Sequence, residues 1–221
     1  MPSQDTATVH RSAKSVRTLT DWMRARFSGL LDRPAGFLVR LGLFPNTITL
    51  LGLAGNMIGA YFLALGHFTI GGLIILAVGP IDALDGAMAR LSGESSKWGA
   101  FVDSTSDRYS ELMIYLGLLI HYVRQGDVTA IVLIFLAAAG SVMVSYVKAR
   151  AEGLDFSAKV GLLTRLERYL VLSPTLIFNI PLVGLWIVAV LANFTAVQRI
   201  WFVRRQGWTE IWKERERKKD Q

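Results

Sequence analysis

The chain reads Asp82-Ala-Leu-Asp85-Gly86-Ala-Met-Ala89-Arg90 and, after a polar segment, Gly99-Ala-Phe-Val-Asp103-Ser-Thr-Ser-Asp107. Apolar sequence lies on both sides of these four aspartates. An ionisable side chain inside a bilayer costs from about 2.5 to well above about 10 kcal/mol, so it is retained where it faces a cavity, a partner or an ion. The stretch therefore predicts a membrane fold with a polar site built on these two segments.

The composition agrees with a membrane protein. Of the 221 residues, 52% are hydrophobic and 19% are charged, and the mean hydropathy is +0.39. A bilayer crossing takes about 20 predominantly apolar residues, and six apolar runs fill almost all of the chain after residue 44. We therefore predict an all-α integral membrane fold with six transmembrane helices, over residues 48–65, 68–84, 98–122, 128–147, 169–180 and 181–203.

The chain divides into three parts by composition. Residues 1–43 are predicted to be a cytosolic lead-in with an amphipathic helix, residues 44–205 the membrane domain, and residues 206–221 a charged cytosolic tail. The amphipathic helix has apolar side chains at three- and four-residue spacing flanked by arginines, which predicts that it lies at the membrane interface. Docking on the protein's own surface is an equal alternative. Gly55 and Gly59 predict close helix packing, inside the monomer rather than at a dimer seam.

The distribution of charge predicts an orientation. The formal net charge is +7, and lysines and arginines concentrate in the amino-terminal segment, in two alternate loops and in the tail. By the positive-inside rule both termini are cytosolic, so we expect a multi-pass protein of the cell membrane with the aspartates at the cytosolic face. This pattern reports topology and argues against binding to nucleic acid. The chain has no cysteine, which excludes disulfides, thiolate zinc sites and cysteine nucleophiles.

The spacing of the four aspartates predicts two pairs. Positions three or four apart share a helix face, so Asp82 projects with Asp85 at the end of one helix, and Asp103 projects with Asp107 at the start of the next. Like charges this close raise each other's pKa, so the cluster needs either protons or cations. An all-oxygen ligand set suits Mg²⁺, Mn²⁺ or Ca²⁺. The neighbouring glycines and Arg90 leave room and positive charge for a phosphate, which favours the metal.

The order Asp-x₂-Asp-Gly-x₂-Ala-Arg-x₈-Gly-x₃-Asp-x₃-Asp over residues 82–107 resembles the signature of the CDP-alcohol phosphotransferases. The resemblance implies a six-helix membrane domain, usually homodimeric, that transfers a phosphoalcohol or phosphatidyl group from a CDP-linked donor to an alcohol and releases CMP. It implies two Mg²⁺ ions, with Mn²⁺ possible in their place. Their ligands would be Asp82, Asp85, Asp103 and Asp107.

The resemblance also implies individual roles for residues near the aspartates. Asp107 would be the general base that takes the proton of the acceptor hydroxyl. Contacts to the nucleotide would come from Asn46, Thr49, Asp82, Gly86, Ala89, Arg90, Ser96 and Gly99.

A second basic cluster bears on the acceptor. Several cations lie at predicted cytosolic helix ends, on the side of the aspartates, and guanidinium groups bind phosphate bidentately. Ser145-Tyr-Val-Lys-Ala-Arg-Ala-Glu152 and the later Arg-x-Glu-Arg segment resemble the prokaryotic phosphatidylinositol-phosphate synthases, which couple CDP-diacylglycerol to inositol 3-phosphate, although Leu166 stands where proline is expected. Glycerol 3-phosphate is the alternative acceptor, and an archaeal-type lipid donor stays open. The resemblance implies acceptor-phosphate contacts from Lys148, Arg150, Arg165, Arg168 and Arg199.

Two functions from other classes are alternatives. An ion- or proton-coupled transporter would use the aspartates as an ion path and pair Arg108 with Glu111, but the carboxylates lie near one mouth and no inverted repeat is evident. A non-catalytic scaffold would leave the aspartate spacing unexplained, and ordinary pairing with nearby basic side chains would explain one aspartate pair but not two.

Overall fold

The structure is a computed structural model, and it describes residues 32–93 and 96–219. In these ranges the chain is helical with short connections, which confirms the all-α prediction. The predicted interfacial helix before residue 32 lies outside the described residues; residues 32–40 are helical. The main elements are α2 (Pro45–Ala64), α3 (Phe68–Ser92), α4 (Lys97–Gln125), α5 (Val128–Glu152), α6 (Arg165–Ile177) and α7 (Pro181–Lys219).

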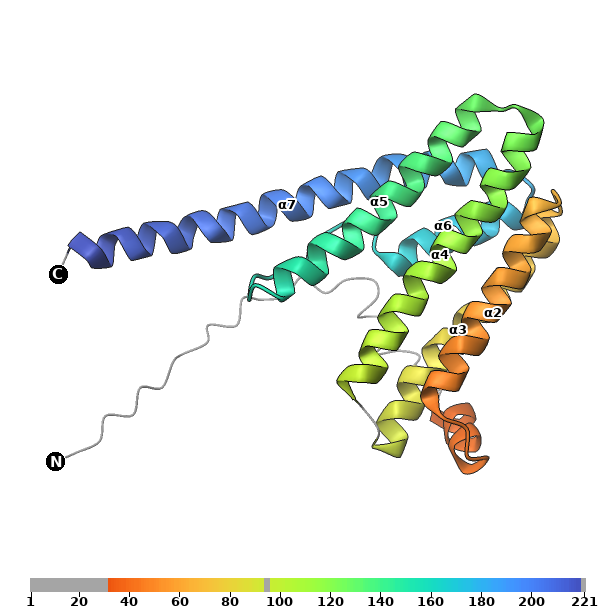
Figure 1. Cartoon of the computed structure of the whole chain (residues 1–221), viewed down its shortest axis with the longest axis horizontal. Coiled ribbons are helices and arrows are strands. Elements are labelled where there is room, and N and C mark those ends of the chain that lie inside the picture. Colours follow the sequence, from red (N-terminus) through yellow and green to blue (C-terminus); the bar gives the residue numbers. More distant parts are fainter. Residues whose placement is uncertain (1–31, 94–95, 220–221) are drawn as a thin grey trace.

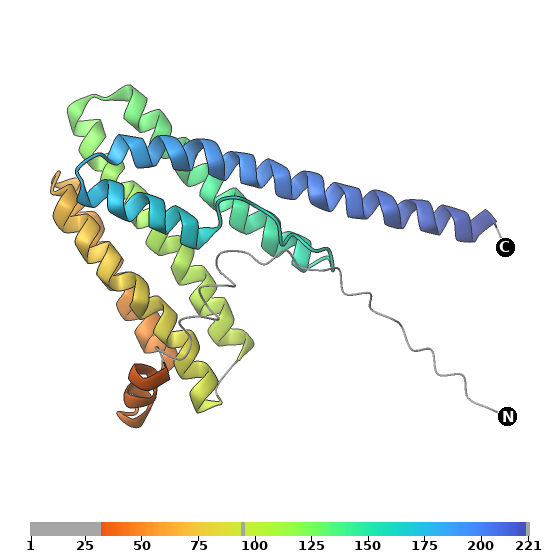
Figure 2. The ribbon, with the colours of Figure 1, turned by 180° about the vertical axis from the view of Figure 1, so that it is seen from behind.

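The helices diverge from one end of the molecule. The turns that join α2 to α3, α4 to α5 and α6 to α7 lie together there, whereas the α3–α4 loop, the α5–α6 loop and the end of α7 lie away from it (Figures 1 and 2). Helix α2 packs on both α3 and α4, α5 packs on α7, and α6 lies against α3 and α7. Because the aspartate segments and the basic loop both lie away from the common turns, they can contribute to one site.

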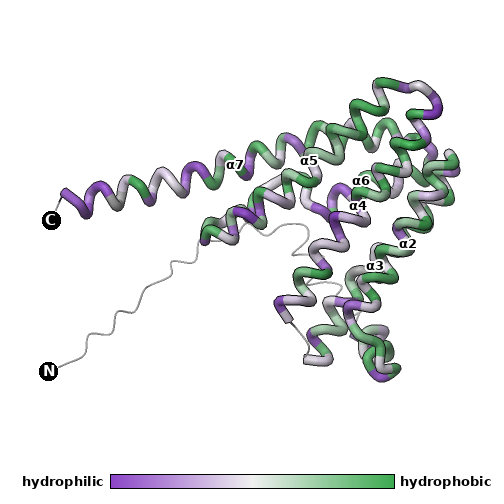
Figure 3. Tube along the Cα trace, in the orientation of Figure 1, coloured by the Kyte–Doolittle hydropathy of each residue, from purple (hydrophilic) through white to green (hydrophobic). Residues whose placement is uncertain are grey.

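Four of the described helices, α2, α3, α5 and α7, are long and apolar enough to cross a membrane. Figure 3 shows the apolar character of α2, α3, α5 and the first half of α7. Large apolar side chains point outward, among them Phe135 and Phe178, of which more than 70% is exposed. Helix α4 has 29 residues but carries several charges, and α6 has only 13, fewer than the about 20 that a straight crossing needs.

Local signals explain where the helices begin and end. Helix α2 begins at Pro45. An N–H in the first turn of a helix has no helical acceptor, so proline costs no hydrogen bond there. Gly126, with φ +69°, ends α4 in the left-handed conformation that favours glycine. The next residue, Asp127, caps α5 by accepting a 3.0 Å hydrogen bond from the Ala130 N–H.

Glycines allow α2 to approach its neighbours closely. A Cβ on Gly55 would lie 2.6 Å from Val78 Cγ2, and a Cβ on Gly59 would lie 2.8 Å from Ile75 Cγ1, both on α3. The prediction that this glycine pair packs helices inside the monomer is therefore confirmed. Gly117 of α4 does the same on the other side of α2, because a Cβ there would collide with the backbone carbonyl of Ala60.

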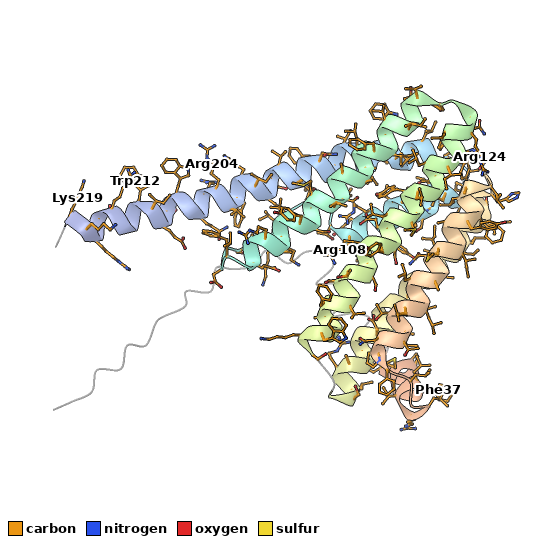
Figure 4. All side chains as sticks on the ribbon, viewed as in Figure 1. Phe37, Arg108, Arg124, Arg204, Trp212 and Lys219 are labelled. Atoms are coloured by element: carbon orange, nitrogen blue, oxygen red, sulfur yellow. The ribbon has the colours of Figure 1, made fainter. Side chains whose placement is uncertain are left out.

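Two helices extend beyond their predicted limits. The second apolar run was expected to end near Leu84, but α3 continues to Ser92, so Asp82 and Asp85 lie inside a helix rather than at its end. Helix α7 runs without interruption from the apolar segment into the charged tail. Figure 4 labels Arg204, Trp212 and Lys219 along this extension, far from Arg124 at the other end of the molecule.

Candidate active site

The first turn of α2 holds the aspartate segment of α3. The Thr49 hydroxyl donates a 2.5 Å hydrogen bond to Asp85 Oδ2, and the backbone N–H of Gly86 donates to Oδ1 of the same carboxylate. Asp85 is only 5% exposed. A carboxylate fixed by two donors at the protein interior has a defined orientation, which suits the role of oxygen ligand predicted for Asp85.

The same turn of α2 also reaches the start of α4. Ser96 caps α4 by accepting a 3.0 Å hydrogen bond from the Gly99 N–H. A Cβ on Gly99 would lie 3.3 Å from Ser96 Oγ and 3.6 Å from Asn46 Oδ1. Three of the predicted nucleotide residues therefore meet at one place, and Thr49, one turn further along α2, touches the aspartate segment.

The remaining predicted nucleotide residues follow Asp85 along α3. The nearest side-chain atom to a Cβ built on Gly86 would be Arg90 Nη1, at 3.7 Å, so the backbone at Gly86 is uncrowded. Arg90 is exposed and Ala89 is partly exposed. This strip of α3 therefore presents small residues and one cation to an incoming ligand.

The second aspartate pair lies on α4. Asp103 and Asp107 are one helical turn apart and both are partly buried. Asp107 Oδ2 lies 2.7 Å from Arg165 Nη1 at the start of α6, and its side chain is 13% exposed. The predicted general base is thus in direct contact with a predicted acceptor-binding arginine.

The carboxylates whose side chains are described do not form one tight cluster. Helices α3 and α4 both pack on α2, and within the described residues no three metal-binding side chains come close enough together to hold an ion. The Asp82 side chain lies outside the described part. The donors that are described, Asp85, Asp103 and Asp107, are all carboxylate oxygens, which fits a hard divalent cation.

The exposed members of the basic cluster lie on two helix ends, the end of α5 and the start of α6. The Arg165 side chain is 44% exposed although it contacts Asp107. Lys148 is similarly exposed and lies 3.9 Å from Glu152, one turn along α5. Arg150, on the same turn, is exposed. These three side chains are accessible to a ligand.

Arg168 and Arg199 are instead buried and bonded to protein groups. Arg168 Nε and Nη2 donate to the Glu111 carboxylate at 2.6 and 2.8 Å, and Nη1 donates to the Leu163 carbonyl at 3.3 Å. Arg199 donates to the carbonyls of Val160 and Val144, at 2.8 and 2.6 Å. These bonds tie α6 to α4 and the α5–α6 loop to α5 and α7.

Glu111 lines the same region, and its partner differs from the one that the transporter alternative expects. It was considered as a partner for Arg108, but its carboxylate binds Arg168, and the Arg108 guanidinium donates to the Ser104 carbonyl of its own helix. Figure 4 labels Arg108 on the edge of α4 nearest α5 in that view. The spacing Arg165-x-x-Arg168 against Asp107-x₃-Glu111 was the available signal, because both pairs share a helix face.

A small cavity of about 40 Å³ lies next to these two ion pairs. Its walls come from α2, α3, α4 and α6. They include both ion pairs and the polar side chains of Asn56, Ser110 and Ser173. The site is therefore a continuous polar region from the aspartates of α4 to the arginines of α6.

Comparison with known proteins identifies the family. The family model for CDP-alcohol phosphatidyltransferase matches residues 42–204. The chain belongs to the CDP-alcohol phosphatidyltransferase family. The resemblance stated from the aspartate motif is thus confirmed, and the matched residues nearly coincide with the predicted membrane domain.

Two curated relatives are similar over most of their length. A phosphatidylinositol phosphate synthase of Streptomyces avermitilis is 41% identical over 86% of this chain and 84% of its own. An archaetidylinositol phosphate synthase of Pyrococcus horikoshii is 36% identical over 83% of this chain and 96% of its own.

Solved structures of one enzyme share the fold. Phosphatidylinositol phosphate synthase of Mycobacterium tuberculosis is 30% identical to this chain. Its structure with CDP-DAG bound has a TM-score of 0.74 and covers 78% of this chain and 92% of its own. Its structure with manganese and citrate has a TM-score of 0.73, covering 78% and 88%.

Proposed function

We propose that the protein transfers the phosphatidyl group of CDP-diacylglycerol to inositol 3-phosphate, giving phosphatidylinositol phosphate and CMP. The observation that carries this proposal is the contact between Asp107 and Arg165. This contact joins the aspartate segment, whose chemistry is the same for every acceptor used in the family, to the basic cluster. Only an acceptor that carries a phosphate needs the basic cluster. The phosphatidylinositol phosphate synthases among the relatives support the same acceptor.

The aspartates would hold a divalent cation. Asp82, Asp85, Asp103 and Asp107 are proposed as ligands for two Mg²⁺ ions, with Mn²⁺ able to replace them; the manganese complex of the mycobacterial enzyme supports a divalent metal. When bound, the metal neutralises charge on the diphosphate and on the CMP leaving group. Thr49 keeps the Asp85 carboxylate oriented for this role, and Asn46, Ser96, Gly99, Gly86, Ala89 and Arg90 would surround the cytidine diphosphate.

Asp107 would act as the general base. Its carboxylate oxygen accepts the proton of the acceptor hydroxyl while the hydroxyl oxygen forms a bond to the phosphatidyl phosphorus. The bond from that phosphorus to the oxygen of CMP breaks, and CMP leaves. A positioned base of this kind contributes about 10² to 10⁴-fold in rate.

The basic cluster would bind the acceptor phosphate. Lys148, Arg150 and Arg165 are exposed to solvent. Arg165, which contacts Asp107, would hold the acceptor phosphate beside that carboxylate. Arg168 and Arg199 are buried, and we propose that they hold the helices around this pocket in place. Their direct contact with the acceptor phosphate stays a prediction.

The membrane arrangement follows from the charge pattern. We infer six membrane crossings: the four apolar helices together with α4 and α6, which would cross the bilayer inside the bundle. Both termini would then lie in the cytosol, and the site would lie at the cytosolic face. An interfacial amino-terminal helix and a homodimer remain part of the proposal, as do the division into residues 1–43, 44–205 and 206–221.

Two variants of this chemistry have support. Glycerol 3-phosphate carries the same phosphate and would use the same cluster. An archaeal-type CDP-linked lipid is favoured as an alternative donor by the similarity to the Pyrococcus horikoshii synthase.

The test is a CMP-release assay with purified protein and Mg²⁺. CDP-diacylglycerol and its archaeal-type counterpart are each combined with inositol 3-phosphate, glycerol 3-phosphate, free inositol and serine. Release with inositol 3-phosphate that EDTA stops and Mg²⁺ restores is the expected result. No CMP with any acceptor would refute the enzyme, and release only with glycerol 3-phosphate would refute the acceptor.

A further inference from the structure

Helix α3 contains a break in its backbone hydrogen bonding just before the aspartates. Pro80 lies inside the helix. Proline has no N–H, so the carbonyl four residues earlier, that of Leu76, loses its helical partner. A helix broken in this way can bend at this point, and the segment beyond the break carries Asp82 and Asp85.

A tyrosine of α6 occupies this break. The Tyr169 hydroxyl lies 2.8 Å from the Leu76 carbonyl and 2.7 Å from the Ile75 carbonyl, and it accepts a 3.2 Å hydrogen bond from the Gly79 N–H. In a regular helix the Gly79 N–H would bond the Ile75 carbonyl. The hydroxyl is therefore inserted into the backbone hydrogen bonding of α3. It lies within hydrogen-bond distance of the Leu76 carbonyl, which Pro80 leaves without its helical donor.

The sequence of α3 is shaped to admit this hydroxyl. A Cβ on Gly79 would collide with the Tyr169 hydroxyl. Two turns earlier, a Cβ on Gly72 would lie 2.8 Å from the Leu176 Cβ, and the Thr69 hydroxyl donates a 3.0 Å bond to the Ile177 carbonyl. The register of α6 on α3 is thus fixed at both ends, and Tyr169 cannot slide away from the break.

The same turn of α6 also holds the second aspartate helix. Arg165 contacts Asp107, and Arg168 binds Glu111 through two hydrogen bonds. Three neighbouring side chains of α6 therefore bind both helices that carry the aspartates. Because α3 and α4 are otherwise related mainly through α2, this turn is a second brace between them.

We propose that Tyr169 is a positioning residue, which fixes the direction of the α3 segment with Asp82 and Asp85 relative to α4 and so sets the separation of the two aspartate pairs. The consequence for metal binding rests on the proposed function, whereas the geometric consequence does not. Tyr169 touches neither the nucleotide nor the acceptor in this assignment.

The geometric test uses spin labels, which the chain accepts cleanly because it has no cysteine. Leu91→Cys on α3 and Tyr109→Cys on α4 place labels at exposed positions of the two helices. We expect pulsed-EPR distances between them to shift or broaden in Tyr169→Phe, which removes only the hydroxyl. Tyr61→Phe, at an exposed position of α2, is the matched control and leaves the distances unchanged.

The functional test measures Mn²⁺ affinity by EPR in the unlabelled proteins. Loss of one hydrogen bond of about 1 kcal/mol predicts a rise of about five-fold in the Kd for Mn²⁺, with the melting temperature within a few degrees of wild type. Gly79→Ala, whose added methyl displaces the hydroxyl, is expected to act in the same direction and replaces Tyr169→Phe if that variant does not fold.

The outcomes separate the two proposals. Wild-type distances together with wild-type Mn²⁺ affinity in both variants would overturn the role of Tyr169 and leave the proposed function intact. If the wild-type protein binds no Mn²⁺ but the label-to-label distances change in Tyr169→Phe, the positioning role of Tyr169 is upheld and the metal assignment is refuted. A lower melting temperature with unchanged distances and affinity would mean that Tyr169 only stabilises the fold, which also overturns the proposal.

Discussion

Replacing Arg168 or Arg165 separates a structural arginine from a ligand-binding one. Both arginines lie on the first turn of α6 and both contact a carboxylate of α4, but the Arg168 side chain is 3% exposed and the Arg165 side chain is 44% exposed. Removing one partner of a buried ion pair costs about 3–5 kcal/mol, because the other charge is left uncompensated. An exposed pair is worth about 1 kcal/mol or less.

These magnitudes predict different stabilities. Arg168→Met removes the two hydrogen bonds that Arg168 donates to Glu111 and the one that it donates to the Leu163 carbonyl. A fall in melting temperature of about 6–20 °C is therefore expected for a chain of this length. Arg165→Ala is expected to change the melting temperature by about 4 °C at most. Its effect is expected in the KM for inositol 3-phosphate, with little change for free inositol.

The assay is thermal unfolding in detergent, joined to a double-mutant cycle. The double variant Arg168→Met with Glu111→Leu removes both charges from the interior, and such replacements are often neutral. It should therefore be more stable than Arg168→Met alone. A melting temperature of Arg168→Met equal to wild type, or a double variant that simply adds the two single losses, would refute the assignment of Arg168 as an internal brace.

Three further predictions concern the aspartate site and the packing around it. Asp107→Asn is expected to lower the rate of CMP release by about 10² to 10⁴-fold, with a change in melting temperature of about 4 °C at most, as for Arg165→Ala; activity near wild type would exclude it as the base. Thr49→Val removes a hydrogen bond to a carboxylate and should raise the Mg²⁺ concentration for half-maximal activity by about ten-fold or more, and an unchanged metal requirement would contradict its orienting role. Gly117→Ala forces a methyl against the Ala60 carbonyl, so it should lower the melting temperature, while Gly36→Ala, which meets no atom within 4 Å, should not; equal melting temperatures for the two variants would count against this packing.

The sequence alone predicted the helical segments and the family because both depend on local pattern. Apolar runs of membrane length indicated the helical segments, and the fixed spacing of Asp85 and its neighbours indicated the family. The capping signals at Pro45 and Asp127 are equally local, since each satisfies backbone groups within its own turn.

The missed features depend on contacts between distant segments. The predicted helix of residues 68–84 already included Pro80, but local pattern did not predict that a hydroxyl from Tyr169, far along the chain, bonds the backbone carbonyl of Leu76 there. Arg165 and Arg168 look alike in sequence, three residues apart, and only the packing of α6 on α4 exposes one and buries the other. Glu111 likewise has possible basic partners on its own helix and on α6, and the fold selects Arg168.

The most direct test of the central claim is the identity of the lipid formed from CDP-diacylglycerol and inositol 3-phosphate. The claim is that the aspartates and the basic cluster form one site for a phosphorylated acceptor. Mass spectrometry of the lipid extract should then show a phosphatidylinositol that keeps the acceptor's phosphate, formed in proportion to CMP and reduced by about 10²-fold or more with Asp107→Asn. A lipid product without that phosphate, or CMP release with no inositol-containing lipid, would contradict it.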